Sequence, residues 1–219
     1  QRTMINTVIL DFDGTIGDTC SLIVRTMQQT LDAVGLPMQS DAQCAAMIGL
    51  PLRQCFSQLM PMDDVTAARC ESTYREIFAR NNADYKVQVF PNVVETIKQL
   101  HNSGMKICIA SSRSRHSLLA FLDDMALDGY VQIVVAANDV EHPKPAPDMI
   151  IRILGETGSR ADEAIMVGDT RYDIDMGRAA GAVTCAVTYG NGKIEELGEA
   201  DYRISDFSQL AGIISKLNS

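Results

Sequence analysis

Residues 7–19 read TVILDFDGTIGDT, and this stretch decides how the rest of the chain is interpreted. An apolar run ends at Leu10, and two aspartates, Asp11 and Asp13, follow it one residue apart. Like charges this close repel each other, and burying either is costly unless a cation lies between them. The two aspartates are therefore either exposed acids at the end of a strand or members of a site that binds a metal or carries out a reaction.

Residues 4–10 form the first of several short runs, rich in Val and Ile, that predict buried strands. The others are 106–111, 132–137, 164–169, 183–188 and, more weakly, 202–206. Helical patterns lie between them, at 92–104, 114–125, 146–157, 171–180 and 206–216. In the first helix, Asn92 is the expected N-cap and Gly104 the C-terminal stop. This alternation predicts an α/β fold with a doubly wound (Rossmann-like), mostly parallel sheet covered on both faces.

The segment from Thr19 to about Tyr85 interrupts this alternation, because four helical patterns follow one another there without a convincing strand. We predict a small all-α subdomain inserted after the first strand, on linkers near 15–19 and 82–90. The expected division is an α/β core of residues 1–16 and 86–219, with a helical cap of residues 17–85.

Composition narrows the class of protein. The chain of 219 residues is 46% hydrophobic, as expected of a globular protein. Its net charge of −9 argues against a nucleic-acid binder, which needs a basic face. The six cysteines form no C-x-x-C pair, which favours free thiols and a cytoplasmic location. We expect no membrane span, since no apolar stretch is long enough for one. We expect the protein to be either a monomer or a homodimer.

Polar residues follow four of the predicted strands at the point where each strand ends. In open α/β sheets, ligands bind outside the carboxyl ends of the strands, so these residues are expected to converge on one edge. The residues are Asp11 and Asp13 after the first strand, Ser111 and Ser112 after the second, Lys144 beyond the third, and Asp169 and Asp173 after the fourth.

The residue types at this edge point to phosphate chemistry. Several carboxylates in one crevice need a hard cation, and oxygen ligands without His or Cys favour Mg²⁺. Lys144 offers a point charge and Ser111 a hydroxyl donor, which suit phosphate oxygens. An aspartate can then act as a nucleophile that forms an aspartyl-phosphate. A second carboxylate can protonate the leaving oxygen and later activate water.

The motifs DFDGT (11–15), ICIASS (107–112), Lys144 and GDTRYD (168–173) resemble, in order, the four signature motifs of the haloacid dehalogenase superfamily. The helical segment resembles the inserted cap of that superfamily, so the likeness covers essentially the whole chain. It is similar to the phosphatase branch that includes phosphoglycolate phosphatase.

The resemblance implies a role for each motif residue. It makes Asp11 the nucleophile and Asp13 the general acid and base. It implies a Mg²⁺ ion on Asp11, the Asp13 backbone carbonyl and Asp169, supported by Asp173. Ser111 and Lys144 would hold the phosphoryl group of a small phosphorylated metabolite. Further substrate contacts are expected from Gly14, Thr15, Ser112, Arg113 and, in the cap loop GLPL (49–52) and beside it, Leu50 and Arg53.

Other interpretations of single motifs fit less well. DFDG could open a calcium loop, but Ile16 and Leu22 stand where an EF-hand needs Gly and Glu. GNGK (190–193) is no P-loop, because it lacks the upstream Gly and Ile194 replaces the required Ser or Thr. Taken singly, Ser111 is a typical turn or N-cap residue and Lys144 a typical loop lysine; only the constellation singles them out.

The leading hypothesis is a magnesium-dependent phosphomonoester hydrolase, and three alternatives stay open. One is a pseudo-enzyme that only binds phosphorylated partners, although every chemical group for the reaction is present. A phosphosugar mutase uses the same core, and the sequence does not separate it from a hydrolase. A phospho-accepting signalling domain of the receiver type shares the acids, the hydroxyl and the lysine, but it lacks a helical insertion after its first strand. A dehalogenase is disfavoured, because a halide leaving group needs no proton from Asp13. A phosphonate hydrolase is disfavoured because residues 14–85 contain no lysine for a Schiff base.

Overall fold

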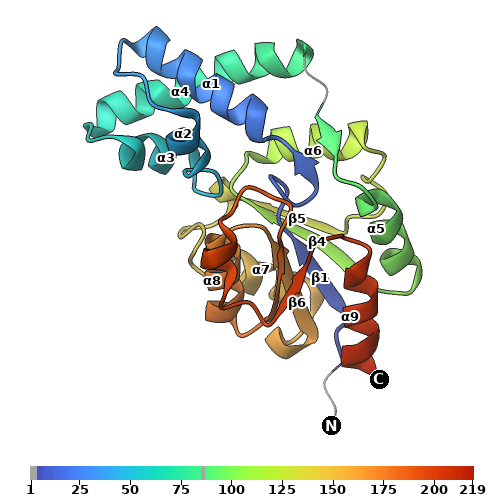
Figure 1. Cartoon of the computed structure of the whole chain (residues 1–219). Helices are drawn as coiled ribbons and strands as arrows, with labels where there is room; N and C mark the ends of the chain where they lie inside the picture. The colour runs from blue at the N-terminus through green and yellow to red at the C-terminus, as the bar shows by residue number, and fades with distance from the viewer. Residues whose placement is uncertain (1–3, 85–86) are drawn as a thin grey trace.

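A six-stranded parallel sheet forms the centre of the computed structural model, which describes residues 4–84 and 87–219 (Figure 1). The strand order is β5-β4-β1-β6-β7-β8, and every neighbouring pair runs parallel. The strands are β1 (Thr7–Leu10), β4 (Lys106–Ser111), β5 (Ile133–Ala136), β6 (Ala164–Gly168), β7 (Val183–Val187) and β8 (Tyr202–Ile204). The predicted doubly wound sheet is confirmed, and each strand lies within its predicted run.

Helices cover both faces of this sheet because successive strand residues point to opposite sides. In β1, Val8 and Leu10 pack in one hydrophobic cluster, with α5 (Val93–Asn102), α6 (Arg115–Asp124) and α9 (Gln209–Asn218). Ile9, between them, packs in a second cluster, with α7 (Asp148–Thr157) and α8 (Arg171–Ala180). Three short 3₁₀ turns complete the core, at Ala137–Asp139, Ala161–Glu163 and Ile194–Leu197.

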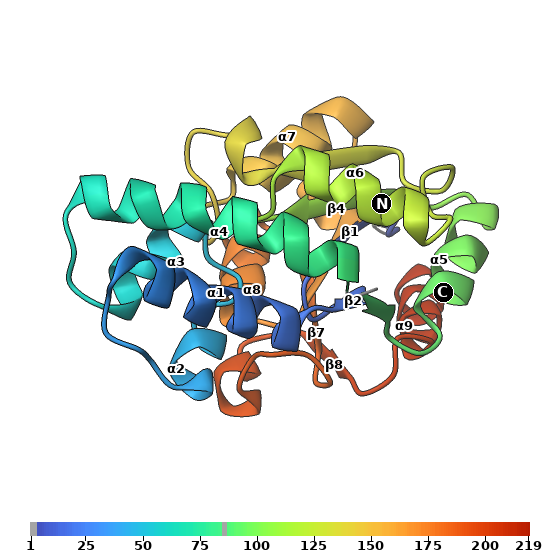
Figure 2. The ribbon, with the colours of Figure 1, turned by 90° about the horizontal axis from the view of Figure 1, so that it is seen from above.

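Four of the described helices are inserted between β1 and α5: α1 (Cys20–Val34), α2 (Asp41–Ala45), α3 (Leu52–Leu59) and α4 (Asp64–Asp84). They share a hydrophobic cluster of their own, which includes Leu31, Phe56 and Tyr74. The insertion lies beyond one edge of the sheet (Figures 1 and 2). A separate core supports the predicted helical cap, although its boundaries stay a prediction and Tyr85, at its expected end, lies outside the described residues.

A second, two-stranded antiparallel sheet joins the two ends of the insertion. It pairs β2 (Gly17–Asp18) with β3 (Gln88–Val89). The sequence analysis assigned these residues to linkers and predicted no strand there. Two residues are too few to show the alternation that identifies a strand.

Asn92 corrects one detail of the predicted helix start. The helix begins at Val93 as expected, but the Asn92 side chain makes no capping bond and its backbone is left-handed, with φ of 64°. Its Nδ2 instead donates to Asp206 Oδ2 at 2.8 Å. Asn92 therefore links the start of α5 to the segment before α9 through this hydrogen bond.

Among the described helices, none is long and apolar enough to cross a bilayer.

Candidate active site

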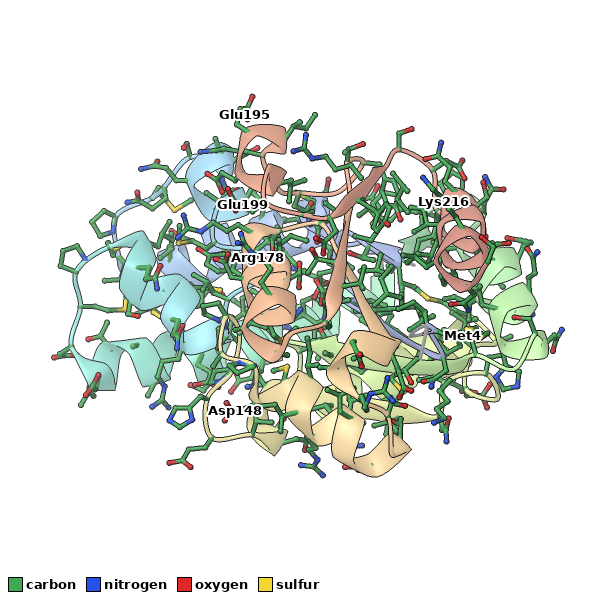
Figure 3. All side chains as sticks on the ribbon, turned by 90° about the horizontal axis from the view of Figure 1, so that it is seen from below. Met4, Asp148, Arg178, Glu195, Glu199 and Lys216 are labelled. Carbon is green, nitrogen blue, oxygen red and sulfur yellow. The ribbon has the colours of Figure 1, made fainter. Side chains whose placement is uncertain are left out.

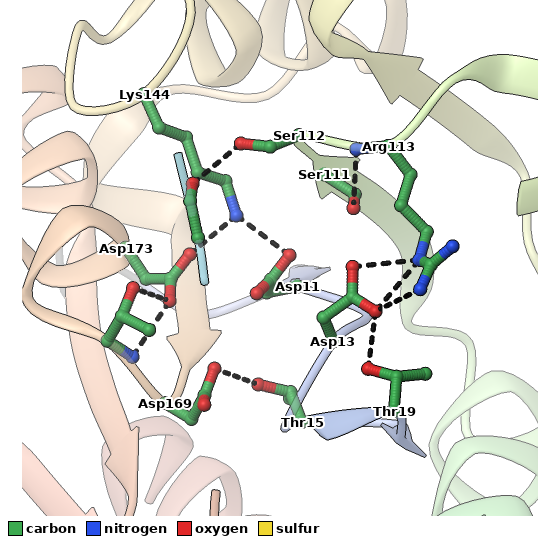
Figure 4. Close-up of polar contacts among 12 residues, drawn as sticks. Asp11, Asp13, Thr15, Thr19, Ser111, Ser112, Arg113, Lys144, Asp169 and Asp173 are labelled. Carbon is green, nitrogen blue, oxygen red and sulfur yellow. Dashed lines mark hydrogen bonds and ion pairs between the residues drawn. The ribbon is translucent and has the colours of Figure 1, made fainter. Parts of the chain in front are cut away.

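The predicted site residues converge on the carboxyl edge of the sheet. Asp11 follows β1, Ser111 ends β4 and Asp169 follows β6. Because β1 lies between β4 and β6, these three chain segments are immediate neighbours. Lys144 reaches the same place from the loop between β5 and α7 (Figure 4). The expected convergence of four separate segments is therefore present.

Three carboxylates form the centre of this site. Oxygen atoms of Asp11, Asp169 and Asp173 all lie within 4.8 Å of one another, and all three residues are buried. Asp173 is oriented by the start of α8, where its Oδ2 accepts from the backbone nitrogen and the hydroxyl of Thr170, at 3.0 and 2.8 Å. This is the capping-box spacing, in which an acid three residues into the helix binds back to the N-cap.

Crowding of these acids changes their proton affinity. Burial, followed by the nearby charge of Asp173, raises the pKa of Asp11 to about 7, although Lys144 partly offsets this. Burial and the charges of Asp173 and Asp11 also raise the pKa of Asp169 well above its ordinary value. Ionising all three groups therefore costs free energy unless further positive charge is present.

Lys144 supplies part of that charge. Its Nζ lies 2.8 Å from Asp11 Oδ1 and 2.5 Å from Asp173 Oδ1, and the residue is 1% exposed. Burial alone would lower the pKa of Lys144, but the two carboxylates outweigh it and raise the pKa above the ordinary value. The lysine is therefore held as a cation within the acidic cluster.

Asp13 points to a different partner from its neighbour Asp11. Its Oδ1 lies 2.7 Å from Nη2 of Arg113, and both its carboxylate oxygens lie 2.8 Å from Nε of the same residue. Its Oδ1 also accepts a hydrogen bond from the hydroxyl of Thr19 at 2.5 Å. The carboxylate of Asp13 is therefore not part of the cluster of Asp11, Asp169 and Asp173. This agrees with the metal site that the resemblance implies, in which only the backbone carbonyl of Asp13 binds the ion.

Arg113 is held in place by aromatic rings as well as by Asp13. Its guanidinium lies 4.9 to 5.7 Å from the ring centres of Phe12, Phe78 and Phe121. Phe78 belongs to the insertion, whereas Phe12 and Phe121 belong to the core. Burial opposes the charge on Arg113, but the carboxylate of Asp13 more than compensates and raises its pKa. Arg113 thus contacts the predicted general acid and both parts of the molecule.

Gly14 and Thr15 bring the loop after β1 against Asp169. Gly14 has a φ of 80°, and a Cβ built there would lie only 2.1 Å from Asp169 Oδ2. Only glycine fits such a close approach in this left-handed conformation. The Thr15 hydroxyl donates a long hydrogen bond of 3.4 Å to Asp169 Oδ1. Both residues therefore shape the carboxylate cluster, and their expected contact with substrate stays a prediction.

The two serines after β4 play different parts. Ser111 is buried, and its Oγ accepts a hydrogen bond of 3.3 Å from the backbone nitrogen of Arg113. The Ser112 hydroxyl donates to the carbonyl oxygen of Gly49 at 2.7 Å. Gly49 belongs to the insertion, so Ser112 links the two parts of the molecule directly beside the site.

The two predicted cap residues lie in contrasting places. Leu50 is buried in the hydrophobic cluster of the insertion. Arg53 is exposed, with Nε 3.1 Å from Oε2 of Glu71. The loop that carries Leu50 does reach the core through Gly49, yet neither side chain contacts the catalytic carboxylates in a described interaction. Their assignment to the substrate stays a prediction.

Asn191 is a site residue that the sequence analysis did not identify. Its backbone nitrogen donates to Asp169 Oδ2 at 2.6 Å, which helps to fix that carboxylate. The sequence shows only that GNGK (190–193), which contains Asn191, does not form a P-loop. The glycines on either side were the available signal, since a Cβ at Gly190 or Gly192 would collide with Asp169, at 2.3 and 1.9 Å.

Residues 8–187, most of the chain, match the family model for haloacid dehalogenase-like hydrolases. The chain belongs to this family. Among its relatives, a Dickeya dadantii protein named "Probable phosphatase IndB" is 32% identical over 210 residues, covering 94% of this chain and 91% of that protein. Pyrophosphatase PpaX of Bacillus cereus (strain G9842) is 31% identical over 217 residues, 98% of each chain.

Two solved structures share the fold of this chain. A hydrolase from Pseudomonas syringae superposes with a TM-score of 0.86 and 25% identity, over 98% of this chain and 100% of the other. A "predicted phosphatase" from Clostridium acetobutylicum superposes with a TM-score of 0.89 and 24% identity, over 98% and 100%. The predicted superfamily, fold and phosphatase class are therefore confirmed.

The donor set of this family member fits a divalent metal ion. Asp11, Asp169 and Asp173 present only oxygen atoms, and they are close enough to bind one ion together. Burial and the neighbouring carboxylates raise the pKa of Asp11 and Asp169 although Lys144 lies beside them. A hard dication at this position would favour the ionised forms of these two carboxylates.

Proposed function

We propose that this haloacid dehalogenase-like enzyme is a Mg²⁺-dependent phosphomonoester hydrolase that acts on a small phosphorylated metabolite through an aspartyl-phosphate. One observation carries the proposal above all others. The buried carboxylate of Asp11 lies against Lys144 and within 4.8 Å of Asp169 and Asp173, where a transferred phosphoryl group and its cation can be held together. A structural ion pair would not need three buried acids around one lysine.

Asp11 is the nucleophile in this proposal. One of its carboxylate oxygens attacks phosphorus, the bond from phosphorus to the leaving oxygen breaks, and an aspartyl-phosphate forms. Lys144 and Ser111 stabilise the phosphoryl oxygens, the lysine as a charge and the serine as a donor. A bound Mg²⁺ would supply additional stabilisation of the negative charge that develops on these oxygens.

Asp13 transfers the protons. In the first step it gives a proton to the leaving oxygen. In the second step it takes a proton from the water that attacks the aspartyl-phosphate, so that inorganic phosphate is released and Asp11 is regenerated. Arg113 positions this carboxylate, since its Nη2 lies 2.7 Å from Asp13 Oδ1.

The fold weighs against the receiver-type alternative, because four helices are inserted directly after the first strand. The phosphosugar mutase differs only in where the phosphoryl group goes next. A mutase returns it to a second sugar oxygen, whereas a hydrolase gives it to water. The experiment below separates the two outcomes by product.

Phosphate release tests the proposal. Wild type and Asp11→Asn are assayed against a panel of small phosphoesters and inorganic pyrophosphate, in Mg²⁺ and in EDTA. We expect turnover in Mg²⁺, loss of activity in EDTA, and a decrease of more than about 10⁴-fold in Asp11→Asn, as for loss of other catalytic nucleophiles. Thermal unfolding of both proteins controls for folding. A rearranged sugar phosphate without phosphate release would instead identify a mutase, and unchanged activity in Asp11→Asn would refute the nucleophile.

A further inference from the structure

A cleft of about 270 Å³ lies between the insertion and the core. Thr170 and Asn191 line it, and their backbone nitrogens donate to Asp173 and Asp169 of the carboxylate cluster. Its wall on the insertion is formed mainly by small side chains, namely Ala42, Ala45 and Ala46. Its wall on the core comes from the start of α8 and from the loop at 191–193. Clefts that hold drug-sized ligands usually measure about 300–1,000 Å³, so this one fits only a compact group.

The cleft carries positive charge in a protein whose net charge is −9. Arg171 and Lys193 line it together with one acid, Glu196. The lysine and this acid are 3.7 Å apart, and both are well exposed, so their attraction is weak. Arg171 stacks over Tyr172 at 5.3 Å, and within residues 4–84 and 87–219 no carboxylate forms an ion pair with it. Both cations are therefore available to a ligand.

An amide group connects the cleft with the catalytic site. The side-chain nitrogen of Asn191 is buried and has no hydrogen-bond partner in the described structure. A Cβ built on Gly14 would touch both this nitrogen, at 2.5 Å, and Asp169 Oδ2, at 2.1 Å, which places the amide beside the carboxylate cluster. A buried donor without a partner costs free energy, and an acceptor on a ligand would remove that cost.

We infer that this cleft binds a negatively charged leaving group. Asn191 would donate to it at the catalytic end, and Arg171 and Lys193 would bind its charge farther out. The substrate would then be a compact molecule with two anionic ends, the transferred phosphoryl group and a second phosphate or a carboxylate. This inference rests on the proposed hydrolase activity and names its substrate class.

A pair of matched substrates tests the inference. Phosphoglycolate and 2-hydroxyethyl phosphate differ only in that a carboxylate replaces a hydroxymethyl group, and inorganic pyrophosphate tests a second phosphate in the same position. KM and kcat are measured for the wild type and for the double variant Arg171→Gln/Lys193→Gln. The control is Arg178→Gln, on the same helix as Arg171; Arg178 pairs with Glu199 (both labelled in Figure 3), and neither residue lines the cleft.

We expect KM for phosphoglycolate, for pyrophosphate or for both to rise about tenfold or more in the double variant, as for the loss of a charged contact. KM for 2-hydroxyethyl phosphate should change less than about twofold on the same scale. The substrate whose KM rises shows whether the cleft binds a carboxylate or a second phosphate. Equal effects on all three substrates would overturn the inference and leave the hydrolase intact, and so would no effect on either substrate that has a second anionic group.

Binding without turnover separates this inference from the proposed reaction. The dissociation constants of pyrophosphate and phosphoglycolate are measured by calorimetry for Asp11→Asn, with and without the two glutamine substitutions. A tenfold weaker affinity for either ligand in the triple variant would support the subsite even if the panel released no phosphate. An unchanged affinity for both would refute it.

Discussion

The core and the helical insertion bury polar side chains in different ways. At the edge of the core, the carboxylates of Asp11 and Asp173 are buried against the Nζ of Lys144. In the insertion, the buried hydroxyls of Thr26 and Thr30 donate to carbonyl oxygens of their own helix, each at 2.7 Å. These two threonines of the insertion are therefore satisfied within their own helix, whereas the edge of the core buries ionisable groups that a reaction can use.

This difference suggests a division of labour. Chemistry belongs to rigid strand ends, where the sheet fixes each side chain, and selection belongs to the surface at which the insertion meets them. Substitutions at the core edge should accordingly cost far more than those at the contact between the two parts. Three changes test this, in order of decreasing effect.

Asp13→Asn should give the largest effect of the three. The amide has nearly the same shape but cannot exchange a proton with the leaving oxygen, so kcat should fall about 10²–10⁴-fold. Phosphate release under saturating substrate measures it. Arg75→Gln, which changes an exposed cation of the insertion paired with Glu71, serves as the control. A variant that retained full kcat would show that Asp13 transfers no proton.

Lys144→Gln should mainly reduce stability, because it leaves Asp11 and Asp173 buried without their cation. Removal of one partner from a buried ion pair costs about 3–5 kcal/mol in the free energy of unfolding. Urea unfolding in the absence of divalent metal measures this cost. The exposed Lys216→Gln should change stability by less than about 0.5 kcal/mol. If the two variants were equally stable, the buried cluster would not depend on the lysine.

Ser112→Ala should have the smallest effect, since it removes one neutral hydrogen bond between core and insertion. We expect a loss of about 0.5–1.5 kcal/mol in the free energy of unfolding. Ser72→Ala is the matched control, because that hydroxyl binds only Arg69 O within α4. A loss for Ser112→Ala no larger than for Ser72→Ala would mean that this bond does not hold the insertion to the core.

The strands and the catalytic edge could be predicted from sequence because both depend on local patterns and on topology. Buried parallel strands are continuous apolar runs, and parallel strands place their carboxyl ends at one edge. The convergence of Asp11, Ser111, Lys144 and Asp169 at this edge followed from these two facts, whereas their roles in a reaction stay a prediction.

Contacts that depend on loop conformation could not be predicted in this way. The pairing of Asp13 with Arg113 requires residues 100 positions apart to meet beneath an aromatic ring of the insertion. The unpartnered amide of Asn191 depends on how its loop folds over Asp169. The orientation of Arg53 could not be predicted either. Its place beside a recognised loop does not reveal whether its long side chain points toward the site or toward Glu71, which it contacts.

The small β2–β3 sheet has a consequence for how this architecture diversifies. Because Gly17–Asp18 and Gln88–Val89 pair with each other, the chain leaves the core and returns to it at a single point. Everything between these strands could be lengthened, shortened or exchanged without separating β1 from its neighbours in the sheet. A chimera that carried another helical segment between the same two strands should still assemble the sheet, so new specificities could be acquired by grafting while the reaction is inherited.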